Sequence, residues 1–143
     1  MKGEGMERAA ARVTSAVLFV SRLDRSVEFY RDVFCCAATI HERDAALLLA
    51  PGGFQIYLIA RGINAEHSSS GIGLQYLIWA VGSDAELRDV AQALRDRARR
   101  TDNYTSGGVT FLAAHDPDGI RILVAHPSPE ELPRSVIGAQ LYV

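Results

Sequence analysis

The sequence has few cysteines, no excess of positive charge and no long hydrophobic run. Its two cysteines, Cys35 and Cys36, are adjacent, and a bridge between neighbours would need a strained ring, so we expect reduced thiols and a cytoplasmic location. Fifteen basic and seventeen acidic residues give a net charge of −2, which argues against a nucleic-acid partner. No segment approaches the ~20 apolar residues that span a bilayer, and the polar start is unlike a secretory signal, so no membrane partner is expected.

What the sequence does contain is an order of elements that occurs twice. In each half, an apolar run too short for a buried helix predicts a strand, and a helical apolar period follows it. Ser21 with Asp24, and Ser83 with Glu86, are typical of helix starts. Further strands are expected over residues 38–41, 45–50 and 54–60 in the first half, and within 101–108, at 109–115 and at 120–126 in the second.

Two alignments of the chain with itself support a duplication. Residues 51–58 match residues 117–124 at an offset of 66, and residues 18–20 match residues 79–81 at an offset of 61. The sequence therefore predicts one α+β domain of two βαβββ modules. The expected parts are a loosely ordered segment 1–12, module one 13–60, a linker 61–73, module two 74–126 and a tail 127–143.

Two segments resemble a known family. The run VLFVSRLDRSVEFYRDVF at 17–34 and the run DPDGIRIL at 116–123 are similar to the vicinal oxygen chelate superfamily, which includes glyoxalases, bleomycin resistance proteins and extradiol dioxygenases. The resemblance covers residues 13–126 and implies a curved mixed sheet around a cup-shaped cavity, with the helices outside. Cys35 stands where the family usually has the glycine that ends the helix.

The resemblance also implies where a metal would bind. Members that use one draw His or Gln from the first strand of each module and Glu from the last. Those positions are Ser15, Tyr57, Tyr76 and Leu123 here. A hydroxyl, two phenols and a leucine do not supply the nitrogen and carboxylate donors that a catalytic divalent cation needs. We therefore expect no metal and no cofactor.

Strand alternation then defines a candidate cavity, because residues two apart share a face. The expected lining is apolar and aromatic with a few polar groups, which is typical of a small-molecule pocket. Its tyrosines either stack on a ligand or fill the cavity as core. Arg121 either pairs with a ligand carboxylate or lies at the rim, bonded to Gln55 or solvent. The candidate residues are Ser15, Val17, Phe19, Gln55, Tyr57, Tyr76, Ile78, Arg121 and Leu123.

The remaining chemistry is sparse. The four histidines, at 41, 67, 115 and 126, share no metal-ligand spacing, and only His115, beside Asp116, is a candidate acid or base. No catalytic residue can be assigned. The apolar end of the tail, with Val136, Ile137, Leu141 and Val143, either covers the cup or buries itself against a second subunit. Because relatives of this fold are often homodimers, we expect one.

Three functions remain open. The first is a metal-independent binding protein that captures a hydrophobic or planar small molecule, as in the drug-sequestering branch of the superfamily. The second is an enzyme of the same superfamily, of lyase, isomerase or dioxygenase type. It would act without metal through Tyr57, Tyr76, Arg121 or His115, or with a metal at non-standard donors. The third is a structural or regulatory dimer with a filled cup.

Overall fold

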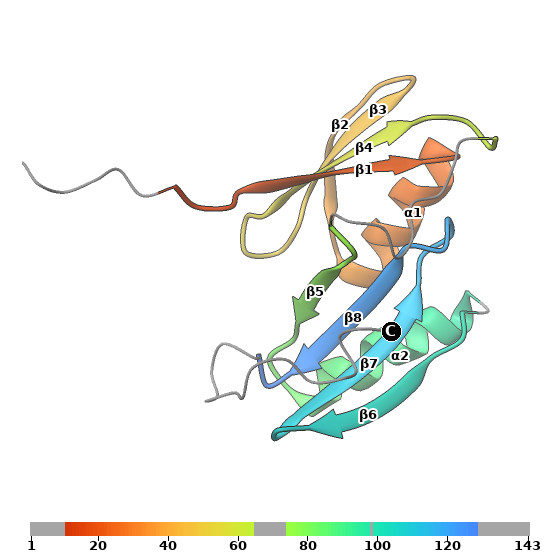
Figure 1. The fold of residues 1–143 in the computed structure, drawn as a ribbon. Helices are drawn as coiled ribbons and strands as arrows, with labels where there is room; N and C mark the ends of the chain where they lie inside the picture. The colour runs from red at the N-terminus through yellow and green to blue at the C-terminus, as the bar shows by residue number, and fades with distance from the viewer. Residues whose placement is uncertain (1–10, 65–73, 98, 129–143) are drawn as a thin grey trace, which may run out of the picture.

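The computed structural model describes residues 11–64, 74–97 and 99–128 and consists of two βαβββ modules (Figure 1). The elements of module one are β1 (Ser15–Val20), α1 (Leu23–Phe34), β2 (Ala37–His41), β3 (Ala45–Leu49) and β4 (Gln55–Ala60). The elements of module two are β5 (Leu77–Ala80), α2 (Asp84–Asp96), β6 (Asp102–Ser106), β7 (Val109–His115) and β8 (Arg121–His126). Most of the expected linker and tail lie outside the described residues.

Each module has its own four-stranded mixed sheet. The strand orders are β1-β4-β3-β2 and β5-β8-β7-β6, and in each sheet the first strand of the module runs parallel to the last. The α+β class and the two βαβββ modules are confirmed, although the strands form two sheets rather than one continuous curved sheet. Val17 pairs with Tyr57, and Ile78 pairs with Leu123. These two pairs differ by the offsets of 61 and 66, so the duplication extends to the strand register.

The two helices begin differently. In α2 the predicted start holds, since the Ser83 hydroxyl accepts a hydrogen bond from Glu86 N at 3.1 Å. The prediction that α1 starts at Ser21 is wrong: the N-cap is Arg22, which makes no side-chain cap. Ser21 instead donates its hydroxyl to Asp118 in module two. Neither helix of the described residues is long and apolar enough to cross a membrane.

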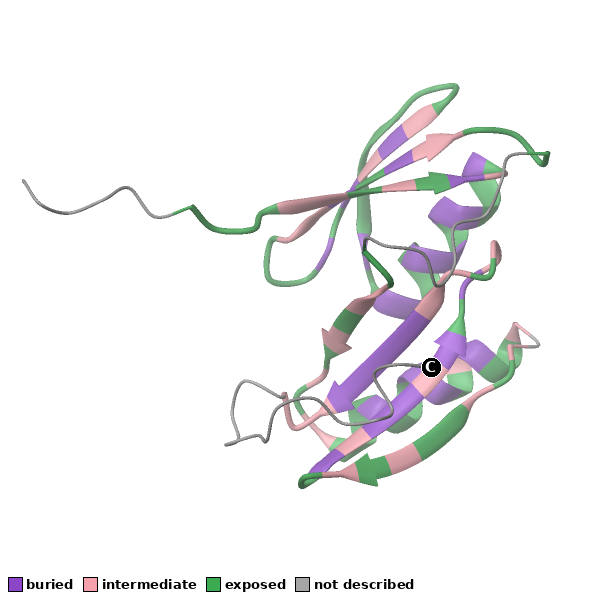
Figure 2. Ribbon diagram, in the orientation of Figure 1, coloured by how far each residue is buried: buried purple, intermediate pink, exposed green. Residues whose placement is uncertain are grey.

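One hydrophobic core runs through both modules (Figure 2). The sheet of module one contributes Leu48, Ile56 and Leu58 under α1. The sheet of module two contributes Ile122 and Val124 under α2. The exposed fraction of each of these five residues is 2% or less. These residues alternate with others on the opposite face of each sheet, as the strand period requires. The helices therefore cover one face of each sheet and leave the other face to form a site.

The modules are joined through α1. Its Phe34 stacks on Trp79 of β5 with ring centroids 4.0 Å apart and planes 14° apart. The Tyr30 hydroxyl of α1 donates to Asp116 Oδ2 at 2.7 Å, in the turn between β7 and β8. Both contacts connect residues far apart in the sequence, so they fix how the sheets face each other.

The two cysteines lie in different environments. Cys35 is exposed and Cys36 is buried, and both are free thiols. Burial, followed by the neighbouring Cys35, raises the pKa of the Cys36 thiol to about 11. A thiol with so high a pKa is protonated at neutral pH and reacts slowly. Cys36 is therefore a packing residue.

Cys35 occupies a left-handed backbone conformation, with φ 59° and ψ 30°, at the C-cap of α1. Only glycine adopts this region without a steric cost. We expect Cys35→Gly to raise the free energy of unfolding by about 0.5–1 kcal/mol. Cys35→Ala removes the same thiol without relieving the backbone and is the matched control. Urea unfolding checks both variants, and equal stability of the two would contradict the prediction.

Candidate functional site

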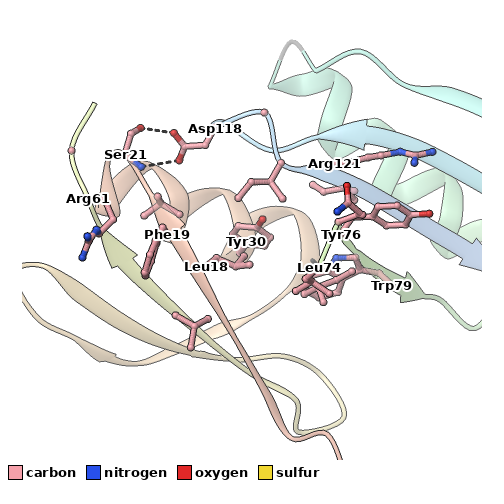
Figure 3. A pocket seen from close by; sticks show the side chains of 18 residues that line it. Leu18, Phe19, Ser21, Tyr30, Arg61, Leu74, Tyr76, Trp79, Asp118 and Arg121 are labelled. Carbon is pink, nitrogen blue, oxygen red and sulfur yellow. Dashed lines mark hydrogen bonds between the residues drawn. The ribbon is translucent and has the colours of Figure 1, made fainter. Parts of the chain in front are cut away.

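A cavity of about 590 Å³ lies between the modules (Figure 3). Its walls come from the end of β1, the residues after β4, the residues before and within β5, and the turn that leads into β8. The cavity volume falls within the range of about 300–1,000 Å³ that is usual for small-molecule sites. The fold places this cavity where the uncovered side of β1 meets module two.

Most of the cavity wall is apolar. Its apolar residues include Leu18 and Phe19 of β1, Leu77 and Trp79 of β5, and Ile120 from the turn before β8. Phe19 is 58% exposed, so a large aromatic surface is available at the mouth. Flat apolar molecules bind well against such walls because burial of both surfaces removes them from water.

The polar groups on one side of the cavity are already engaged. Tyr30 donates to the buried Asp116, and burial, followed by the Asp116 charge, raises the pKa of this phenol well above its usual value. Tyr30 therefore stays protonated at neutral pH. Asp118 accepts hydrogen bonds from the Ser21 amide at 3.0 Å and from the Ser21 hydroxyl, and it pairs with Arg25 at 3.2 Å.

Two arginines line the cavity from different modules. The Arg61 guanidinium lies over the Phe19 ring, 4.7 Å from its centroid, and the Arg121 guanidinium lies over the Tyr76 ring at 4.6 Å. Cations in this position are attracted by the negative ring face. Each pair consequently combines a fixed positive charge with an aromatic surface at the cavity wall.

The nine predicted site residues fall into three groups. Four line the cavity: Val17, Phe19, Tyr76 and Arg121. Three others form a polar cluster on module one, where Gln55 Oε1 accepts from the Ser15 hydroxyl at 3.3 Å and from the Tyr57 hydroxyl at 3.5 Å. Gln55 is thus bonded within its own sheet.

The last two predicted residues, Ile78 and Leu123, lie elsewhere. Ile78 is 47% exposed and is not part of the cavity wall. Leu123 is fully buried in a second cluster with Val109, Phe111 and Ala125. Strand alternation placed Leu123 on the correct face of its sheet. In module two, however, side chains of β7 and β8 pack over that face.

Fourteen of the eighteen wall residues are not among the predicted site residues, and two of these, Arg61 and Trp79, show why. Arg61 continues the alternation of Tyr57 and Ile59, so the strand period pointed to it, although it was assigned to the linker. Trp79 alternates with Ile78, so the strand period places it on the face under the helix. It does stack on α1, and its ring also reaches the cavity wall, since β5 lies at the edge of its sheet.

At the four expected metal positions, the described side chains do not fit a divalent metal. At the four positions where relatives hold one, Ser15 and Tyr57 bond to Gln55, Tyr76 lies under Arg121, and Leu123 has no donor atom. In the part of the chain that the structure describes, no three His, Cys, Asp or Glu side chains are grouped so that they could hold an ion.

The histidines that the structure describes have local partners or lie on the surface. His41 Nε2 is 3.0 Å from Asp24 Oδ1, and His126 Nδ1 is 3.1 Å from the Val81 carbonyl oxygen. His115, the one acid or base candidate, is exposed and does not line the cavity. His67 lies outside the described residues.

Comparison with known proteins places the chain in a family. Residues 12–124 match the Glyoxalase/Bleomycin resistance protein/Dioxygenase superfamily. A comparison with curated proteins gave no match.

Solved structures with the same fold are distant in sequence. A glyoxylase/bleomycin resistance protein/dioxygenase domain from Frankia sp. EAN1pec has a TM-score of 0.72 at 21% identity, covering 88% of this chain and all of that one. The fosfomycin resistance protein FosX from Listeria monocytogenes has a TM-score of 0.70 at 13% identity, with 86% and 98% covered. A lactoylglutathione lyase from Agrobacterium tumefaciens has a TM-score of 0.64 at 14% identity, with 82% and 95% covered. The sequence match and the two-module fold together show that the chain belongs to the glyoxalase/bleomycin resistance protein/dioxygenase superfamily.

Proposed function

We propose that this protein is a metal-independent binding protein that captures a hydrophobic or planar small molecule between its modules. The observation that carries the proposal is an apolar, aromatic cavity of about 590 Å³ in a member of a metal-using superfamily whose donor positions hold Ser15, Tyr57, Tyr76 and Leu123. The proposal includes a cytoplasmic location, which suits two free thiols.

The family and the similar structures are compatible with binding as well as with catalysis. The family name includes bleomycin resistance proteins, and FosX is a fosfomycin resistance protein, whereas the Agrobacterium protein is a lyase. Fold alone does not choose among these. The choice here comes from the cavity, where the described wall residues offer aromatic and apolar surface and no grouped metal donors.

The test uses N-phenylnaphthylamine, a neutral, nearly flat dye that fluoresces when it enters an apolar site. We expect saturable binding to the wild-type protein and about tenfold weaker binding to Tyr76→Ala, because an aromatic contact contributes roughly 1–1.5 kcal/mol. Tyr57→Ala is the matched control, since Tyr57 does not line the cavity. Weakening by Tyr57→Ala alone would place binding on the open face of module one and refute the proposed pocket.

Metal independence has a separate test. Titration of the same dye before and after dialysis against EDTA is expected to give the same dissociation constant. Elemental analysis of protein purified without added metal is expected to show less than one ion per chain. A stoichiometric ion whose removal abolishes dye binding would overturn this part of the proposal and favour an enzyme.

We also propose that the protein is a homodimer. On the face of module one opposite α1, one cross-strand row runs Val17, Tyr57, Leu47 and Ile40. Three of these residues are 39–54% exposed, and such an apolar row in contact with water is usual for an interface. A second copy carries the same row, so the two rows can cover each other about a two-fold axis.

The dimer is tested by sedimentation. Ile40→Lys is expected to shift the protein to monomer mass, because a charge within an apolar interface is left without a partner. Ala85→Lys, an exposed position on α2, adds the same charge elsewhere and should leave the mass unchanged. Monomer mass in the wild-type protein would dismiss the dimer.

A further inference from the structure

Strand β1 has an edge that borders the cavity. Among the described strands, β1 is the outermost of its sheet and pairs with β4 alone. Five consecutive residues, 17–21, line the cavity, and the first four belong to β1. Because side chains alternate between the two faces of a strand, consecutive residues share a wall only where the strand's edge is turned to that wall. We call this the free edge of β1.

The backbone hydrogen bonds show which groups point to the free edge. The carbonyl oxygens of Thr14 and Val20 accept hydrogen bonds, at 3.0 and 2.8 Å, from the amides of the first residue of β4 and of the residue after its end. In a parallel pair, every second residue directs both of its backbone groups at the partner strand. The even-numbered residues of β1 therefore face β4, and Val17 and Phe19 direct their N–H and C=O groups to the free edge.

The Ser21 amide, two residues further along, supports this direction. It donates to Asp118 of module two at 3.0 Å (Figure 3), so the groups on this side of the chain point at module two. Among the described residues, the backbone groups of Val17 and Phe19 have no hydrogen-bond partner on that side. Two N–H and two C=O groups, in the spacing of a strand, are consequently open to a ligand in the cavity.

The size and the walls of the cavity suit a short peptide at this edge. A strand rises about 3.3 Å per residue, so five consecutive wall residues span roughly 16 Å, about the length of an extended peptide of four or five residues. Leu18, Leu77 and Trp79 offer apolar surface to its side chains. The cavity volume of about 590 Å³ is that of a site for drug-sized ligands, so a second folded copy of the chain is too large to enter.

We propose that the ligand of this cavity is a short apolar peptide in the extended conformation, which adds a strand to the free edge of β1. Its backbone exchanges hydrogen bonds with Val17 and Phe19, and its side chains pack against the apolar walls. The inference rests on the proposed binding function and specifies its ligand. Amide hydrogen exchange at Val17 and Phe19 is expected to be fast in the free protein and to slow when the peptide binds.

Two isomeric peptides provide the main test. The first is acetyl-Val-Ile-Ile-Val-amide, which carries no charge. In the second, N-methylvaline replaces both isoleucines, so the composition is the same but the two middle amides donate no hydrogen bond on either edge. We expect the first peptide to displace N-phenylnaphthylamine from the wild-type protein. The second should bind about tenfold more weakly, because backbone hydrogen bonds to β1 are lost.

Variants of β1 locate the effect. Val17→Pro removes a donor from the free edge and leaves the bonds to β4 in place, since proline is tolerated on the outer edge of a sheet. We expect about tenfold weaker peptide binding. Val17→Ala keeps the amide, so it should bind the dye as Val17→Pro does and the peptide more tightly. Ser15→Pro removes an outward amide of the same strand outside the cavity wall and is the matched control, with peptide binding unchanged.

The possible outcomes separate this inference from the function on which it rests. If the dye binds in a Tyr76-dependent manner and the first peptide does not displace it, the peptide inference is wrong and the binding function stands. Equal binding of the two isomers, or an equal loss in Ser15→Pro and Val17→Pro, would show that the free edge does not recognise the ligand. The isomers decide the question on the wild-type protein even if Val17→Pro does not fold. If neither the dye nor the peptide binds, both proposals fail.

Discussion

Asp116→Ala is expected to lower the free energy of unfolding by about 3 kcal/mol, because it leaves several buried donors without an acceptor. Asp116 is fully buried. Its Oδ1 accepts from the backbone amides of Asp118 and Ile120 at 2.8 and 2.9 Å, and its Oδ2 accepts from the Tyr30 hydroxyl. The carboxylate therefore shapes the turn before β8 and ties that turn to α1. Urea unfolding followed by circular dichroism measures the loss.

Two further variants separate these roles. Tyr30→Phe removes only the contact between the modules and should cost about 1 kcal/mol, whereas the turn keeps its acceptor. Asp116→Asn keeps one carbonyl oxygen for the two amides and should fall between the other variants. A stability of Asp116→Ala within about 0.5 kcal/mol of wild type would show that water replaces the carboxylate and that the joint does not depend on it.

The same residue predicts a dependence on pH. Burial raises the pKa of Asp116 above its usual value, although the hydrogen bonds from Tyr30 and the two amides act in the opposite direction. The folded protein then binds the proton more tightly than the unfolded chain, whose pKa is about 3.9, so stability falls as the pH rises from there through the folded pKa. Relative to the non-titrating Asp116→Asn, wild type should lose stability over this window. The opposite slope would mean that the hydrogen bonds outweigh burial.

Trp79→Ala is expected to destabilise the protein by about 3 kcal/mol, the lower end of the range for large aromatic side chains, because Trp79 is only partly buried. Its ring stacks on Phe34 and lies 6.2 Å from the Tyr30 ring, both on α1. Loss of the indole removes the main aromatic contact between the modules. Far-ultraviolet circular dichroism must report the unfolding, since Trp79 is the single tryptophan.

Trp79→Phe is the control for this prediction. A phenylalanine keeps a flat ring against Phe34 and should recover all but about 1 kcal/mol. A double-mutant cycle with Phe34→Ala measures the coupling between the rings, for which we expect roughly 1 kcal/mol. A cost below about 1 kcal/mol for Trp79→Ala would show that the modules associate through other contacts.

Local patterns in the sequence were sufficient for the elements and their faces. The order βαβββ, its repetition and the strand at 109–115 follow from apolar periods and turn residues, and β7 spans those residues. β4 follows the strand period, since Ile56 and Leu58 are fully buried and Tyr57 between them is 39% exposed. These predictions depend only on neighbours in the chain, where the strand period fixes the geometry.

The predictions that failed depend on contacts between distant segments. Ser21 is a residue type that often caps helices, but its hydroxyl donates a hydrogen bond to Asp118, 97 residues away in the sequence. Leu123 lies on the expected face, yet packing within module two buries it. Arg61 carried a sequence signal in the strand period and was still assigned to a loop. The periodicity within one module carries no information on how the two modules pack against each other. The position and shape of the cavity therefore could not be predicted from the sequence.

Tyr30 and Trp79 belong both to the cavity wall and to the joint between the modules. A mutation at Tyr30 or Trp79 that reshapes the cavity therefore also lowers the free energy of unfolding. Phe19, Arg61 and Leu74 at the cavity mouth are exposed, so substitutions there should change the stability little. Descendants of this protein should acquire new ligands by changing the mouth first. Selection for a new specificity would leave the inner aromatic pair as an inherited constraint.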